Sequence, residues 1–377
     1  MREVKSFDLS RNYLRVKEEV RVAMDRVLDT QHFIMGPEIE AFEKEMAGFL
    51  NVENAITCAS GTDALVLALM SLDLKEGDEV ITTPFTFFAT ASCITRNGAK
   101  PVFVDVEPDT YNISTSQVLE KITPRTKAVI PVHLFGQMAR LEEIKDVLKE
   151  KNIALIEDCA QAIGAHRIIN GEICRAGSVG DVGCFSFFPT KNLGCYGDGG
   201  LVSVANDFER AERIKRLRVH GAGKTYFHDE VGINSRLDAL QAAILRVRLR
   251  HLEEWTEERR LIAERYMLLF AEKSLLDVVT PPVEAENNRH VYHQYVVKAE
   301  NRDALQAYLA ENGIASRIYY PLSLHQQKCF AEFGFKKGDF PVSESLTEEV
   351  LALPMFPELL PEEQEYVVEK IAEFYKK

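Results

Sequence analysis

Membrane-length apolar segments are missing from this sequence of 377 residues. The longest stretch without a charged residue, Val80–Thr95, is rich in threonine and contains a proline, which argues against a spanning helix. Residues 1–20 carry charge from Arg2 onward and lack the apolar core of a secretory signal. We therefore expect neither a membrane protein nor an exported one.

Cysteine pairing signals and a basic surplus are also missing. The seven cysteines are odd in number and form no Cys-x-x-Cys pair, which is typical of free thiols in a reducing compartment. Lysine and arginine number 45 against 58 aspartates and glutamates, so the formal net charge is −13. Because a nucleic-acid binder needs a basic face, we predict a cytoplasmic protein with neither nucleic-acid nor membrane partners.

Several motifs that would indicate other chemistry are absent or incomplete. A Gly-x-Gly-x-x-Gly run does not follow the first predicted strand, which counts against a nicotinamide dehydrogenase. The stretch 220–225, His-Gly-Ala-Gly-Lys-Thr, resembles the end of a phosphate loop, but Arg218 stands where that motif needs its first glycine. His290 and His293 lie on a predicted strand without a third ligand nearby, so we predict no metal site.

Between residues 54 and 204, short β-rich runs alternate with helical patterns. This alternation predicts an α/β fold with right-handed crossovers and a mostly parallel, buried sheet. Helical periodicity covers 61–72, 141–151 and 207–218. The predicted strands are Asn54–Thr57, Glu79–Thr83, Pro101–Asp105, Lys127–His133, Ile153–Glu157, Val182–Phe187 and Gly200–Val204.

The remainder of the chain divides into an arm and a second domain. Two amphipathic helices are expected before residue 50, and a single long helical stretch is expected from Asn234 to about Phe270. Val291–Lys298 and Ile314–Tyr319 are predicted strands on either side of a helix, and a last helix begins near Pro361. We predict a large domain over 1–250 and a smaller α+β domain over 251–377.

Polar residues follow three of the predicted strands, and ligands of open parallel sheets bind at those strand ends. Asp158 comes directly after a buried strand, Ser60–Thr62 opens a helix, and Lys191 lies in an aromatic and glycine-rich stretch five residues after Ser186. Each has a plainer explanation alone. Asp158 could cap a helix with Gln161 as its capping-box partner, Ser60 could be a simple N-cap, and Lys191 could be a surface lysine.

Together, these groups indicate one ligand. The helix start Ser60–Thr62 offers backbone N–H groups and a hydroxyl to an anion. A poorly solvated lysine has a lowered pKa and reacts with aldehydes, and a buried carboxylate needs a cation beside it. A ligand with a phosphate, a basic ring nitrogen and an aldehyde is pyridoxal phosphate.

The chain resembles the DegT/DnrJ/EryC1/StrS family of pyridoxal phosphate-dependent sugar aminotransferases, from about Phe7 to the last helix. Several long motifs in the right order carry this resemblance. They are Gly36-Pro37 with Phe42-Glu43, Ser60–Leu65, Glu157–Gln161, Ser186–Lys191 with Gly199-Gly200, Gly232–Asp238 with Gln241–Ala243, and Tyr320–Leu322 with His325. The resemblance implies transferase fold type I, the aspartate aminotransferase-like fold, with a smaller C-terminal domain.

The resemblance also implies roles for single residues. Lys191 would bind the cofactor covalently and move the substrate proton, while Asp158 would pair with the ring nitrogen and keep it protonated. The other implied cofactor contacts are the phosphate-holding Ser60, Gly61, Thr62 and Ser186, Gln161 near the phenolic oxygen, Phe87 stacked on the ring, and Asn234 from a second subunit. Phe87 could instead be a core aromatic and Asn234 a helix cap. The implied sugar contacts are Arg236, Tyr320 and His325.

Substrate and reaction class follow from the same resemblance. A dehydratase branch of this family has histidine in place of the lysine, so Lys191 favours transamination. The expected reaction moves an amino group from L-glutamate to a nucleotide-linked 3-keto sugar, either a UDP-linked 2-acetamido-3-keto-hexuronate or a dTDP-linked 3-keto-6-deoxyhexose, for glycan biosynthesis. The alternatives are a 4-keto sugar aminotransferase and a non-catalytic sugar-nucleotide-binding relative. The resemblance implies a homodimer with shared active sites.

Overall fold

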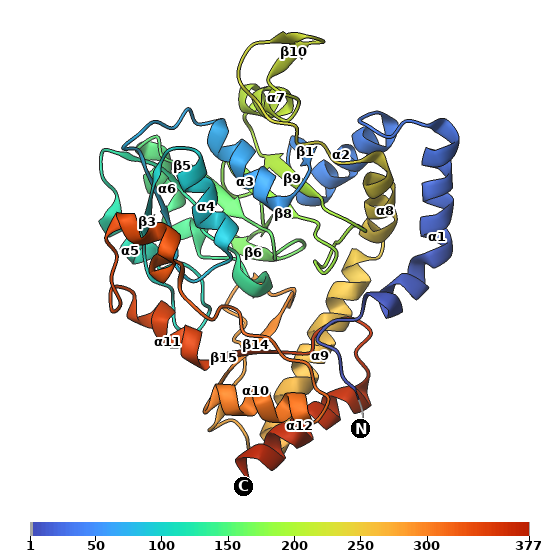
Figure 1. Ribbon diagram of the computed structural model, residues 1–377, viewed down its shortest axis with the longest axis vertical. Helices are drawn as coiled ribbons and strands as arrows, with labels where there is room; N and C mark the ends of the chain where they lie inside the picture. The colour runs from blue at the N-terminus through green and yellow to red at the C-terminus, as the bar shows by residue number, and fades with distance from the viewer. Residues whose placement is uncertain (1–2, 377) are drawn as a thin grey trace.

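A computed structural model describes residues 3–376, and its centre is a seven-stranded sheet in the order β1-β9-β8-β5-β4-β2-β3 (Figure 1). All seven predicted strands are in it, and its bounds are β1 Asn54–Cys58, β2 Glu79–Thr82, β3 Lys100–Phe103, β4 Thr126–Val129, β5 Ala154–Asp158, β8 Val182–Ser186 and β9 Gly200–Val204. Strand β9 runs antiparallel to both neighbours, and the other pairs are parallel. The predicted α/β class with a mostly parallel sheet is confirmed.

Helices cover both faces of this sheet, and each face has its own apolar core. One face is covered by α3 Gly61–Met70, α4 Phe88–Arg96 and α7 Phe208–Leu217. The other is covered by α2 Pro37–Leu50, α5 Thr115–Lys121, α6 Lys145–Glu150 and α8 Ala239–Leu249. Burial on both faces explains why the strands read as continuous apolar runs without alternation.

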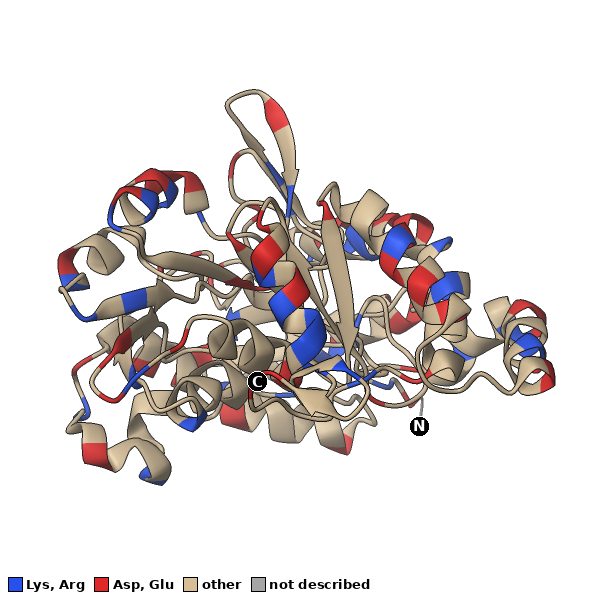
Figure 2. Ribbon diagram, turned by 90° about the horizontal axis from the view of Figure 1, so that it is seen from above, with Lys and Arg blue, Asp and Glu red and all other residues tan. Residues whose placement is uncertain are grey.

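The N-terminal arm packs on the large domain. Helix α1 (Leu9–Thr30) buries one stripe, with Val16, Val20 and Val27, against α8 and Trp255. Basic and acidic residues are interspersed along the outer helices (Figure 2). Among the described residues, no helix is both long and apolar enough to cross a membrane.

The smaller C-terminal unit is built on a three-stranded sheet with its own core. Its strands are β12 Val279–Thr280, β14 Tyr295–Ala299 and β15 Val350–Leu353, and its helices are α9 Leu252–Glu272, α10 Arg302–Glu311 and α12 Pro361–Tyr375. The predicted last helix is confirmed. Both ends of the described chain lie in this unit (Figure 1).

Two expectations for the second half are wrong. The helical stretch from Asn234 to Phe270 is broken at residues 250–251 into α8 and α9. The start of α9 shares the cores of α8, whereas its second half, from Ile262 to Phe270, packs in the C-terminal core. Ile314–Tyr319 forms only isolated bridges, and the strand beside β14 is β15, 30 residues further along. Short apolar runs do not say which of them pairs with a given strand.

The chain returns to the large domain after residue 320. The short helical turns η3 Leu324–Gln326 and η4 Lys328–Phe333 and helix α11 Pro341–Glu349 form this return segment. Phe330 and Phe340 pack on Phe103 at the end of β3. Asp105 accepts hydrogen bonds from the backbone N–H groups of residues 342 and 343 at 2.9 and 2.8 Å. The predicted division at residue 250 stays a prediction.

Two hairpins complete the architecture, and neither was predicted. Strands β6 His166–Ile169 and β7 Glu172–Arg175 form one hairpin, and β6 also pairs with β13 Asn288–Arg289. Strands β10 Ala222–Lys224 and β11 Phe227–His228 form a hairpin that projects from the top of the molecule (Figure 1).

Candidate active site

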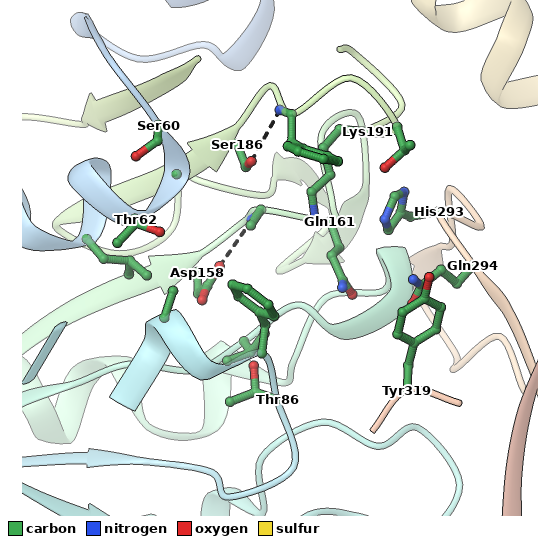
Figure 3. Close-up of a pocket in the computed structure, with 18 of the residues that line it drawn as sticks. Ser60, Thr62, Thr86, Asp158, Gln161, Ser186, Lys191, His293, Gln294 and Tyr319 are labelled. Atoms are coloured by element: carbon green, nitrogen blue, oxygen red, sulfur yellow. Dashed lines mark hydrogen bonds between the residues drawn. The ribbon is translucent and has the colours of Figure 1, made fainter. Parts of the chain in front are cut away.

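A cavity of about 400 Å³ opens where the parallel strands end at their carboxyl termini. Ser60 and Thr62 lie on one side of this cavity and His293, Gln294 and Tyr319 on the opposite side, with Asp158 between them (Figure 3). Nine of the predicted site residues line it, namely Ser60, Gly61, Thr62, Phe87, Asp158, Gln161, Ser186, Lys191 and Tyr320. The fold thus brings together side chains that are up to 260 positions apart in the sequence.

The start of α3 forms an anion cradle at one end of the cavity. Ser60 is the N-cap, and its hydroxyl accepts a hydrogen bond from the backbone N–H of Asp63 at 3.1 Å. A Cβ atom on Gly61 would lie 2.6 Å from the Cβ of Ser186, so only glycine fits there. This close approach places the first N–H groups of α3 and the hydroxyls of Ser60 and Ser186 at the same end of the cavity. Such an arrangement suits a phosphate.

Asp158 is the last residue of β5 and is buried beneath the cavity. One carboxylate oxygen accepts a hydrogen bond from the Thr90 hydroxyl at 2.8 Å, and the other accepts one from the backbone N–H of Ala160 at 3.2 Å. Burial raises the pKa of Asp158 above its ordinary value, against these two hydrogen bonds. A cation placed against this carboxylate would relieve the cost of burying its charge.

The helix-cap explanation of Asp158 is wrong, because no helix begins at Cys159 in the described chain. Gln161 therefore has no capping role. Its side-chain oxygen accepts from the N–H of Phe135 at 2.7 Å, and its amide nitrogen lies 3.3 Å from the hydroxyl oxygen of Tyr320. These contacts orient the amide at the wall of the cavity.

Lys191 follows β8 in a tight loop. Its backbone N–H donates to Phe188 O at 2.8 Å, and a Cβ on Gly194 would lie 2.4 Å from Pro189 O. Protein surrounds the amine, and this burial lowers the pKa of Lys191 to about 8, while the charge of Asp158 opposes the shift. The lysine is therefore no surface residue, and about one tenth of its amine is uncharged at pH 7, roughly a hundredfold more than for an ordinary lysine.

Phe87 lies at the N-terminal end of α4, and 58% of its surface is exposed. The core interpretation of this residue is therefore wrong. An aromatic ring that lines a cavity can stack on a flat ligand.

Asn234, Arg236 and His325 do not line the cavity. Asn234 is exposed, and the neighbouring Ser235 hydroxyl donates to Asp63 at 2.7 Å and accepts from the N–H of Ala59 at 3.1 Å, so this segment lies beside the cradle. His325 is buried and its Nε2 lies 3.0 Å from Glu344. The ligand contacts predicted for these three residues stay predictions.

Other residues of the cavity wall were missed by the sequence analysis. Thr190 and Phe188 belong to the motif that carried Lys191, so their neighbourhood was a usable signal. His293 was considered only as a metal ligand on a strand, but it lies in a turn before β14. The remaining missed residues include Thr86, Asp198, Gln294 and Tyr319. Thr86 and Tyr319 each directly precede a predicted site residue, Phe87 and Tyr320, so adjacency was a usable signal there as well.

A second buried cluster lies just behind the site. Ligand atoms of His133, Glu157 and Cys159 lie within 4.8 Å of one another. His133 Nδ1 accepts from the N–H of Ala139 at 3.1 Å, so its proton is on Nε2, which lies 2.8 Å from Glu157. Glu157 also accepts hydrogen bonds from the backbone N–H groups of residues 177, 179 and 180. Since the imidazole and the carboxylate are both saturated by protein donors and acceptors, this cluster is structural.

Comparison with known proteins gives a consistent result. The model of the DegT/DnrJ/EryC1/StrS aminotransferase family matches residues 15–372. The chain is 49% identical to a "pleiotropic regulatory protein" of Geobacillus stearothermophilus, covering 99% of each chain. It is 46% identical to the UDP-N-acetyl-3-dehydro-alpha-D-glucosamine 3-aminotransferase of Acidithiobacillus ferrooxidans, covering 94% of each. The crystal structure of DesV from S. venezuelae, in complex with a ketimine intermediate, is 37% identical with a TM-score of 0.95 over 100% of both chains.

Proposed function

The chain belongs to the DegT/DnrJ/EryC1/StrS aminotransferase family, and from this premise we propose that it moves an amino group from L-glutamate to a nucleotide-linked 3-keto sugar. The cofactor of the family is pyridoxal phosphate. The observation that carries the proposal is the meeting of Lys191, Asp158 and the Ser60 cradle in one cavity.

The residues present fit this cofactor. The cradle at Gly61, which a Cβ atom would fill, suits the phosphate, and the buried carboxylate of Asp158 suits the ring nitrogen. Phe87 would cover the ring, and Gln161 would contact its phenolic oxygen. When bound, pyridoxal phosphate supplies an aldehyde that accepts amines and a conjugated ring that withdraws electrons from the bond being broken.

Lys191 is the proton carrier of the proposed reaction. With a pKa of about 8, its amine would accept the Cα proton of glutamate and would return a proton to the carbon that carries the aldehyde of the cofactor. An acid–base group is most efficient when its pKa is close to the working pH. One amine on one face of a planar system serves both transfers, and the second half-reaction runs the same steps backwards on the keto sugar.

The 3-keto class of the sugar is supported by the name of the Acidithiobacillus relative. The identity of the group at sugar carbon 6 rests on Arg236, whose planar fork suits a uronate carboxylate, so a UDP-linked 2-acetamido-3-keto-hexuronate is our first choice. A dTDP-linked 3-keto-6-deoxyhexose is the second choice, and a 4-keto sugar is the alternative. The product is an amino sugar for glycan or surface-polysaccharide biosynthesis.

We propose that the working unit is a homodimer with shared active sites. Asn234 is exposed and does not line the cavity of its own chain, although it lies beside the cradle. A partner subunit could therefore bring Asn234 to the phosphate. Mixing inactive Lys191→Ala subunits with Asn234→Ala subunits would regain activity if each site takes the two residues from different chains. Failure of the mixture to regain activity contradicts sharing.

The decisive experiment offers a panel of UDP- and dTDP-linked 3-keto and 4-keto sugars with L-glutamate, and mass spectrometry identifies the sugar that gains an amine. Lys191→Ala should abolish both turnover and the visible absorbance of the bound cofactor. Lys273→Ala, at an exposed lysine after α9, is the matched control. Borohydride reduction should label the peptide that contains Lys191, and a label elsewhere contradicts the proposal.

A second function is favoured by one relative, whose name is that of a regulatory protein. A sugar-nucleotide sensor would not need a lysine of lowered pKa above a buried carboxylate, so Lys191 and Asp158 support the enzyme. A purified protein that stays colourless with added pyridoxal phosphate would favour the sensor. We propose a cytoplasmic reaction, since all seven cysteines are free thiols.

A further inference from the structure

Two polar groups of the cavity wall have no protein partner within the described chain. The first is the ε-amino group of Lys191, which is a hydrogen-bond donor, and the second is Nε2 of His293. Both side chains point into the same cavity (Figure 3). Gln294 Oε1, which is buried without a partner among the described residues, is a further free acceptor of this wall, whereas each oxygen of Asp158 already accepts one hydrogen bond and the hydroxyl of Tyr320 lies against Gln161.

The proton of the His293 ring can be assigned from its neighbours. The side-chain nitrogen of Asn192 donates to the carbonyl oxygen of Val291 at 3.0 Å, so its oxygen must face the imidazole. That oxygen lies 3.1 Å from Nδ1 of His293 and can only accept. Nδ1 therefore carries the proton, and Nε2 presents a lone pair to the cavity. Asn192 directly follows Lys191 in the sequence, so the residue that contacts the imidazole of His293 is also the backbone neighbour of the lysine.

The imidazole stays neutral. Burial lowers the pKa of His293 well below its ordinary value, and the positive charges of Lys191 and Arg259 lower it further. A neutral ring beside an amine is a hydrogen-bond acceptor and not a competing cation.

The turn that carries His293 is held rigidly. The guanidinium of Arg259, which is 2% exposed, donates to the carbonyl oxygens of Tyr292 and Met355 at 3.1 Å each. On the opposite side, a Cβ on Gly136 would lie 3.0 Å from the backbone nitrogen of His293, so the two backbones are in close contact. The backbone of the turn is thus fixed by the fold, and the contact with Asn192 orients the ring.

We propose that His293 is a positioning residue for Lys191: once the ε-amino group is released from the cofactor, rotation of the lysine side chain lets it donate a hydrogen bond to Nε2 of His293. The proposal rests on the role of Lys191 in the proposed function. The bond would hold the released amine near the reacting carbon, so that it can return a proton and later displace the product. It would also favour the ammonium form slightly, because a charged donor makes the stronger hydrogen bond.

The test measures the amine itself in the full chain freed of cofactor. Acetic anhydride acylates only the uncharged amine, so the pH dependence of acylation of the Lys191 peptide, followed by mass spectrometry, gives its pKa. We expect a midpoint near 8 in the wild type, a fall of about one pH unit in His293→Phe, and a smaller fall in His293→Gln, which keeps an acceptor. Acylation of the Lys273 peptide should not change.

Different outcomes separate this proposal from its alternatives. If the Lys191 midpoint is the same in both variants as in the wild type, the proposal is overturned. If that midpoint is unchanged and only the KM for the keto sugar rises, His293 is a substrate contact. If His293→Phe does not fold, as judged by circular dichroism, His293→Gln carries the test alone. Loss of the borohydride label at Lys191 in the wild type would instead reject the proposed function.

Discussion

Glu157 and Asp158 are neighbours on β5, but their carboxylates lie on opposite faces of the sheet and in different surroundings. Glu157 faces a closed interior, where it accepts four hydrogen bonds, from His133 and the backbone N–H groups of residues 177, 179 and 180, at 2.7–2.9 Å. Asp158 faces the cavity and accepts two, from Thr90 and Ala160.

The number of donors decides the ionisation of each carboxylate. Burial acts to raise the pKa of both groups, but the hydrogen bonds to Glu157 outweigh it, and its pKa is lowered. The two hydrogen bonds to Asp158 do not outweigh burial, and its pKa is raised. Glu157 is therefore satisfied by the fold alone, whereas Asp158 is left in need of a cation that the fold does not supply. A buried carboxylate that lacks a cation and enough hydrogen-bond donors is a better sign of a ligand site than burial itself.

The largest expected effect is the loss of activity in Asp158→Asn. The amide keeps the shape and the acceptor for Thr90, but it cannot hold a positive charge on the cofactor ring. We expect kcat/KM to fall about 10² to 10⁴-fold. The free energy of unfolding of the cofactor-free chain should be unchanged or slightly higher, because removing a buried charge outweighs the loss of the single 3.2 Å hydrogen bond from the N–H of Ala160, which would then face the amide nitrogen.

The measurements are steady-state kinetics and urea unfolding. Asp277→Asn, at an exposed residue after α9, is the control and should change neither. Full activity in Asp158→Asn would contradict the pairing of this carboxylate with the ring.

Glu157→Gln should give the opposite result, a loss of stability. The amide nitrogen would face backbone N–H donors, leaving at least one of them without an acceptor. We expect the free energy of unfolding to fall by about 2–4 kcal/mol. Glu172→Gln, at an exposed position of β7, should have no effect, and an equally stable Glu157→Gln variant would show that the closed face is not what distinguishes the two carboxylates.

Lowering the pH should change the contributions of the two carboxylates to the free energy of unfolding in opposite directions. Because the folded pKa of Glu157 is lowered, its stabilising contribution is present above the unfolded value near pH 4 and is lost as the pH falls through the folded pKa. Because the folded pKa of Asp158 is raised, its charge costs stability at neutral pH, and this cost disappears as the pH falls through that raised value. The two variants should therefore converge on the wild type under acid conditions from opposite sides. Thermal unfolding of the cofactor-free chains between pH 4 and 8 measures this convergence, and divergence in the same direction would refute it.

The smallest effect concerns the ring that covers the cofactor. Phe87→Leu should weaken cofactor binding about 2- to 10-fold and leave stability unchanged, because the ring is exposed to the cavity. Phe85→Leu, at a fully buried ring two residues earlier, should instead lower the free energy of unfolding by about 1 kcal/mol or more. Fluorescence titration with pyridoxal phosphate separates the two, and equal affinity in Phe87→Leu would remove the stacking role.

The strands of the large sheet were predictable because each is buried on both faces and is bounded by turn residues. The residues after the strands were predictable for the same reason, since strand ends of a parallel sheet meet along one edge. The pairing of β14 with β15 was not predictable, because the sequence of an apolar run does not indicate which other strand it will pair with. His293 was missed because its turn is shaped by Arg259 and Gly136, which belong to other parts of the chain.

The order of β-runs and helical patterns, together with the local motifs around Lys191 and Asp158, determined the fold class and the class of cofactor. These properties depend on nearest neighbours along the chain and on periodicity, which a sequence records directly. Only the tertiary structure decided that Asp158, and not the adjacent Glu157, faces the cavity with a charge that no cation of the fold balances. It also decided which histidine presents a lone pair to the cavity beside the lysine. Ionisation and hydrogen bonding depend on burial and on donors brought from distant segments, and these exist only after the chain has folded.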